Sequence, residues 1–171
     1  MNSFFSTKPV LKFGAISGLL LVLNELILYY STNTNPYIGE RTSELSIIGL
    51  VIPVIMVVIA ITFLKKNTNI ESFGQIIKPG LIIGFLTALI YIAYTLLFVF
   101  SIEPDTLNQF DEINRQRLIA SGNITDAKDI ADAVQLTRNA FIPGTVLFSI
   151  AINLFIGFLT AVITAIFVRN K

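Results

Sequence analysis

One acidic side chain, Glu25, lies inside the long apolar segments of this 171-residue chain. A carboxyl group is costly to place in hydrocarbon, so it should face other helices rather than lipid. Counting about 1.5 Å per helical residue from the outer end of each segment puts Glu25, Tyr94 and Asn153 in the same leaflet. These three side chains form a candidate polar cluster. Its carboxyl group could respond to protons or to a ligand, or it could be a structural group hydrogen-bonded to Asn153 or to a tyrosine.

The composition excludes the commonest catalytic and metal-binding chemistries. The sequence has no histidine and no cysteine, which excludes Ser–His dyads, thiolate nucleophiles, His-ligated haem and Cys-type zinc sites. No aspartate lies in an apolar segment, so an intramembrane aspartyl protease is excluded as well. We therefore expect no enzyme activity, no catalytic residue, no metal site and no cofactor. The net charge of +1 gives no reason to expect nucleic-acid binding.

Four long apolar segments must position the candidate cluster, at about residues 10–30, 45–64, 80–102 and 144–168. Each approaches or exceeds the roughly 20 helical residues that cross a hydrocarbon core of about 30 Å. Hydrophobic residues make up 54% of the chain, and its mean hydropathy is +0.76. The pattern predicts an all-α fold, a four-helix transmembrane bundle formed by residues 1–171 as a single integral membrane domain. The first segment contains Glu25 and lacks a small-residue cleavage site, so it is expected to be a retained helix.

The prolines suggest where these helices begin. Pro9, Pro79 and Pro143 lie at or just before three of the segments, where a missing N–H costs least. Residues 73–78 should then form a separate short helix at the membrane interface. Pro53 lies inside the second segment, where it should free the carbonyl of Gly49 and kink the helix.

Residues 103–142, between the third and fourth segments, are expected to form a helical extracytoplasmic segment. Pro104 and Asp105 should open its first helix, and Gly122 should end it. Asp111 and Arg115 are four residues apart and can pair on that helix. The segment is expected to lie on the outer surface or over the mouth of the bundle.

Basic residues are segregated along the chain and predict its orientation. One set of flanks and loops carries one acidic residue, Glu71, and seven basic ones: Lys8, Lys12, Lys65, Lys66, Lys78, Arg169 and Lys171. The other set carries five basic and nine acidic residues. The net charges are +6 and −4. Both termini should therefore be cytoplasmic, and the acidic segments should face out.

Small residues recur at four-residue intervals in three of the predicted helices. Gly14 and Gly18 form one such pair, Gly80 and Gly84 a second, and Gly157 lies in a similar stripe of the fourth helix. Such stripes let helix backbones approach closely. They are expected to pack the helices of one chain together, with self-association as the alternative.

Four groups of residues carry a resemblance to a known family. They are Leu11–Gly18, Ser72–Gln75 with Lys78, Ile102–Asp105, and the basic tail Arg169–Lys171. On these residues the chain resembles a family of bacterial membrane proteins defined as domain of unknown function 4199 (DUF4199). The resemblance covers nearly the whole chain and implies four helices with an extended loop between the third and fourth. It implies no activity.

The leading functional expectation is a non-enzymatic integral membrane protein of the bacterial inner membrane, acting as a structural, accessory or partner-binding component. The alternative is a small oligomeric transporter or channel that uses Glu25 as a proton- or ligand-responsive group. The expected partners are the lipid bilayer and either a second copy of the chain or another membrane protein.

Overall fold

The computed structural model describes residues 7–38, 43–67, 72–122, 124 and 126–169. It is 91% helical, and the described residues contain no strand. The elements, in chain order, are α1 (Thr7–Thr32), α2 (Ser43–Asn67), α3 (Phe73–Leu97), the π-helix η1 (Phe98–Ile102), α4 (Thr106–Ser121) and α5 (Ala127–Arg169).

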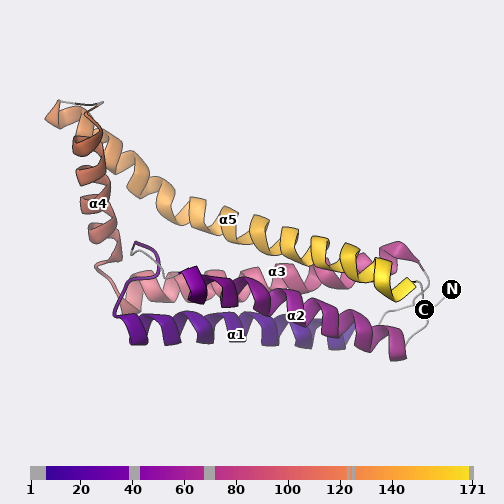
Figure 1. The fold of residues 1–171 in the computed structure, drawn as a ribbon. Helices are drawn as coiled ribbons and strands as arrows, with labels where there is room; N and C mark the ends of the chain where they lie inside the picture. The colour runs from indigo at the N-terminus through magenta and orange to yellow at the C-terminus, as the bar shows by residue number, and fades with distance from the viewer. Residues whose placement is uncertain (1–6, 39–42, 68–71, 123, 125, 170–171) are drawn as a thin grey trace.

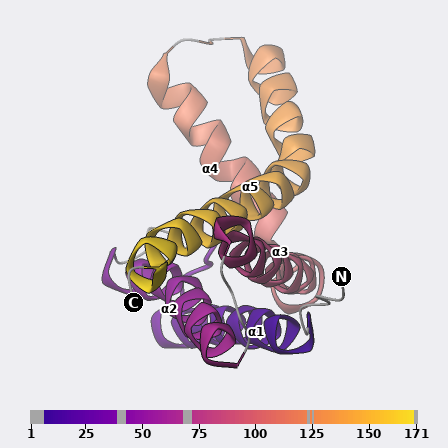
Figure 2. The same cartoon turned by 90° about the vertical axis from the view of Figure 1, so that its right-hand side faces the viewer.

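Four helices lie side by side and alternate in direction along the chain (Figure 1). α3 is central, because its most extensive contacts are with α5 on one side and α1 on the other. α2 contacts α1, α3 and α5. α4 and the first part of α5 form a hairpin that projects away from the other helices, as both views show (Figures 1 and 2).

These four helices are long and apolar enough to cross a membrane, over Lys8–Thr32, Ile47–Asn67, Phe73–Ile102 and Ala127–Phe167. Their outward surfaces are apolar too. Leu19, Leu23 and Ile27 on α1 expose 61%, 51% and 57% of their surface. A band of large aliphatic side chains suits contact with lipid rather than water. The all-helical fold predicted from the sequence, with four potential spans, is confirmed.

Two of the predicted helix starts are wrong. Pro79 lies inside α3, so residues 73–78 are its first turns and not a separate helix. Pro143 lies inside α5, which is one helix of 43 residues. A proline removes one backbone hydrogen bond and strains one turn, and packing on both sides of it can offset that cost. The start of α3 is fixed instead by Ser72, whose Oγ accepts from the Gln75 N–H at 3.3 Å while Gln75 Oε1 accepts from the Ser72 N–H at 3.1 Å.

Five glycines lie where helices approach most closely. Gly14 and Gly18 of α1 face Leu86 and Ile90 of α3. Gly80 and Gly84 of α3 face the backbone of α5 at Gly157 and Asn153. The predicted small-residue stripes are therefore packed within the chain.

The hydrophobic core cluster lies in the half of the molecule that the charges predict to be cytoplasmic. Its fully or nearly fully buried members come from all four long helices: Val10, Val57, Ala60, Ile61, Leu64, Ile76, Ile83, Ala161 and Ala165. At the opposite end of the molecule α5 leans away from α2 (Figure 1). This divergence opens space between the helices.

The hairpin is fixed at its base by Glu103. Its carboxylate accepts from the Tyr29 hydroxyl of α1 at 2.7 Å and from Gln109 of α4 at 3.3 Å. Its carbonyl accepts from the Thr106 hydroxyl at 2.7 Å, and that hydroxyl oxygen accepts from Asn35 at 2.9 Å. The Ile102–Asp105 segment is thus a junction that joins α1, the α1–α2 connection and α4.

Contacts between α4 and α5 hold the hairpin together. Asp111 pairs with Arg138 of α5, which corrects the predicted pairing with Arg115: the opposing helix supplies the closer cation. Next to this pair, the ring centroids of Phe110 and Phe141 lie 4.6 Å apart. Gly122 ends α4 as predicted, in a left-handed conformation with φ of 65°.

Candidate functional site

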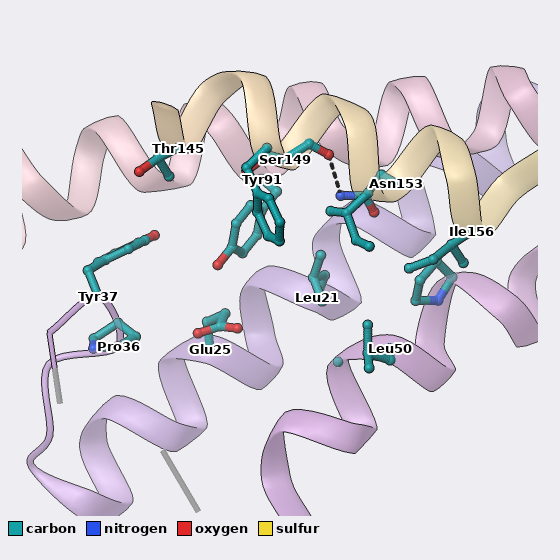
Figure 3. A pocket seen from close by; sticks show the side chains of 14 residues that line it. Leu21, Glu25, Pro36, Tyr37, Leu50, Tyr91, Thr145, Ser149, Asn153 and Ile156 are labelled. Carbon is teal, nitrogen blue, oxygen red and sulfur yellow. Dashed lines mark hydrogen bonds between the residues drawn. The ribbon is translucent and has the colours of Figure 1, made fainter. Parts of the chain in front are cut away.

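A cavity of about 430 Å³ lies where α5 leans away from α2. Its size is at the lower end of the range for small-molecule sites. Leu21 and Glu25 of α1 line it, together with residues of α2, of the α1–α2 connection, of α3 and of α5. Figure 3 shows these side chains converging from several elements.

The mouth of the cavity is apolar. Leu50 of α2 and Phe148 of α5 are 52% and 68% exposed, and both line the cavity. They belong to helices that could cross a membrane. In a bilayer, this opening would meet acyl chains rather than water.

Polar groups are gathered on the inner wall. Glu25 is 3% exposed, Ser149 3% and Asn153 5%. Asn153 Nδ2 donates to the Ser149 carbonyl at 2.9 Å (Figure 3), which turns the amide nitrogen toward its own helix. Pro53 and Gly49 also line the cavity. Pro53 has no N–H to give to the Gly49 carbonyl, so the wall includes a backbone acceptor without its usual helical partner.

Two phenol rings, those of Tyr37 and Tyr91, complete the polar wall. Tyr37 lies in the α1–α2 connection, and its hydroxyl donates to Thr95 of α3 at 2.9 Å. Its ring packs against Phe98 and Phe141, with centroids 5.4 and 6.3 Å away. Burial is the main cause that raises the pKa of Tyr37 above its ordinary value, and the neighbouring Tyr91 phenol adds to it. Tyr37 therefore stays neutral and keeps its hydroxyl proton at physiological pH.

The cavity contains two of the three residues of the predicted cluster. Glu25 and Asn153 line it, whereas Tyr94 does not. Tyr94 is buried one turn further along α3, where its ring packs against Tyr91 and Phe98 with centroids 6.2 and 5.8 Å away. Tyr91 occupies the position expected for Tyr94.

Sequence reasoning missed Tyr37 and Tyr91. Tyr91 had a usable signal, because it continues the stripe of Gly80, Gly84 and Ala88 that packs between helices. Tyr37 had none, since its position depends on how the connection after α1 folds back over α3.

Leu21, Asn153 and Ile156 line the part of the cavity that lies nearest the middle of the helices. Val57 and Ile61 of α2 do not line it and are fully buried in the hydrophobic core cluster. A cavity of this size can hold a small molecule. Among the described residues, no three carboxylates gather in a way that could hold a metal ion.

Of the comparisons with known proteins, the one with protein-family models gives a match. No curated protein and no solved structure matches the chain significantly. The motifs that suggested the resemblance have structural roles here: Ser72 and Gln75 cap α3, and Glu103 joins the hairpin to α1. The family model described as "Protein of unknown function (DUF4199)" matches residues 12–170, nearly the whole chain, and the chain therefore belongs to this family.

Proposed function

We propose that this chain is a non-enzymatic component of the bacterial inner membrane that binds a small molecule in the cavity beside Glu25. The observation that carries the proposal is the cavity itself, which combines a buried carboxyl group with an apolar opening between α2 and α5. A structural carboxyl would be packed against its partners without such a space. Nothing in this wall supplies the His or Cys chemistry of common enzyme sites, because the sequence contains neither residue.

The buried core at Val57 and Ile61 favours binding over conduction. A small oligomeric transporter or channel that uses Glu25 would need a route past the core at Val57 and Ile61. Opening that route would separate helices that bury Val57, Ile61 and Ala161 completely. Binding needs no such movement.

Filling the cavity tests this function. The protein would be purified in a mild neutral detergent and examined by native mass spectrometry for small molecules that remain bound. We expect an adduct on the wild type that Ile152→Trp loses, because Ile152 lines the cavity and the indole ring would occupy it. Phe155→Trp is the matched control, since Phe155 is 59% exposed on the same helix.

Two outcomes would count against a binding role. One is the same adduct profile in all three proteins. The other is a proton flux in liposomes that Glu25→Gln abolishes, which would favour the transporter or channel.

The proposal includes an orientation, with both termini in the cytoplasm and the α4–α5 hairpin outside. It rests on the excess of Lys and Arg near one set of helix ends. Reporter fusions at Lys66, Gly122 and Lys171 should give cytoplasmic, external and cytoplasmic signals, respectively. A cytoplasmic signal at Gly122 would reverse the orientation and place the cavity in the inner leaflet.

A further inference from the structure

We infer that the ligand of this cavity is an amphiphile with an ammonium head group, which enters sideways from the membrane between α2 and α5. The inference rests on the proposed binding function and assigns the chemical class of the ligand. It follows from the polar wall, the apolar mouth and the depth of Glu25 along α1.

The polar wall is built to receive a cation. Glu25 is the one charged residue among the described residues that line the cavity. A carboxylate has about four acceptor positions, so it can attract a cationic head group while it keeps its protein partners.

The aromatic rings point to the same class of head group. Tyr37 and Tyr91 present phenol rings to the cavity (Figure 3). An ammonium group within about 6 Å of such a ring is attracted by its negative face, and aromatic rings with a carboxylate are a common way to bind alkylated ammonium. Phosphate and carboxylate heads would meet a carboxylate without a basic group among the described lining residues, so anionic amphiphiles are disfavoured.

The apolar mouth of the cavity and the depth of Glu25 along α1 suit a ligand that is already in the bilayer. Leu50 and Phe148 at the opening are more than half exposed, so an alkyl chain can leave the cavity between them and remain in lipid. Glu25 is seven residues before the end of α1, which is about 10 Å of helix. A head group at this depth lies just below the interface, with its chain directed sideways.

A single-tryptophan variant can report on binding because the sequence contains no tryptophan. Phe148→Trp would place the reporter at the mouth, and the full chain would be studied in dodecyl maltoside, a neutral detergent. The probe is 12-bromododecyltrimethylammonium, whose bromine quenches indole fluorescence. We expect saturable quenching of this reporter. A second reporter, Phe155→Trp, should show only the weak, non-saturating quenching of micelle partitioning.

Variants of the wall separate the carboxyl and ring contributions. In the Phe148→Trp background, Glu25→Gln and Tyr91→Leu should each lower the affinity for the probe about tenfold. Tyr91→Phe keeps the ring and should bind within about twofold of the parent. If Glu25→Gln fails to fold, the Tyr91 pair alone decides the question, because Tyr91→Leu binding as tightly as Tyr91→Phe would overturn the ammonium assignment.

Probes with other heads separate this inference from the proposed function. We expect 12-bromododecanoate and 12-bromododecanol not to saturate the Phe148→Trp reporter. Saturation by either one and not by the ammonium probe would overturn the ligand class and leave the cavity's binding function standing. Competition by sphingosine, a membrane lipid whose head carries an ammonium group and no phosphate, would identify a membrane aminolipid as the source of the ammonium head, and its absence would indicate a free amphiphile.

Discussion

Gly157→Ala should lower the midpoint of thermal unfolding by roughly 2–12 °C, although it adds a single methyl group. At this position the added Cβ would overlap the backbone carbonyl oxygen of Gly80, and neither backbone can rotate away as a side chain can. α3 and α5 would have to separate along the most extensive helix contact in the molecule. Overpacking of this kind costs about 1–3 kcal/mol, and each kcal/mol lowers the midpoint by about 2–4 °C in a chain of this size.

The measurement is circular dichroism of the purified protein during heating in detergent. Gly144→Ala is the matched control, because Gly144 is also in α5 but a Cβ added there would meet nothing within 4 Å beyond its own stretch of helix. That change should leave stability equal or raise it by up to about 1 kcal/mol, since alanine favours helix over glycine. Equal midpoints for the two variants would mean that α3 and α5 are not packed through Gly80 and Gly157.

The same contact predicts that two substitutions are not additive. Gly80→Ala would push the Cβ of residue 80 into the Gly157 carbonyl from the opposite side. Once one methyl group has separated the helices, the second has less to displace. The double variant should therefore lose less stability than the sum of the two single variants.

The sequence predicts the helices well because their signal is local. A run of about 20 apolar residues has few alternatives to a membrane-spanning helix, and four-residue glycine spacing identifies a face that packs closely. The local cost of proline predicts helix starts at Pro79 and Pro143, whereas both residues lie inside helices. The continuity of α5 depends on distant contacts, such as Arg138 with Asp111, that the sequence does not display.

The sequence predicts only part of the candidate site. The reason is geometric. Counting residues along a helix gives the depth of a side chain but not the direction in which it points. Tyr91 and Tyr94 are three residues apart, so they differ by less than one turn in depth and by about 60° around α3. The direction that faces the cavity is fixed by how α3 packs between α1 and α5, which is a tertiary property. Glu25 was easier to place, since its charge alone requires that it face protein.

Phe98→Ala should be among the most destabilising single substitutions in the half of the molecule that holds the cavity. Phe98 is fully buried in η1, and its ring centroid lies 5.0 Å from that of Tyr29, 5.4 Å from Tyr37 and 5.8 Å from Tyr94. Removing a buried phenylalanine ring costs about 3–5 kcal/mol through lost contacts and the space left behind. The midpoint of thermal unfolding should fall by roughly 6–20 °C.

The neighbouring Phe100 provides the control, because it is in the same π-helix but 59% exposed. Phe100→Ala should change the midpoint little, since its ring has few protein contacts to lose. Phe98→Leu should recover part of the stability by refilling some of the space.

Phe98 also supports Tyr37, whose ring forms part of the cavity wall. Phe98→Ala should therefore lower the affinity for the ammonium probe at temperatures where the protein is still folded. An unchanged probe affinity would show that the Thr95 hydrogen bond alone holds Tyr37 in place.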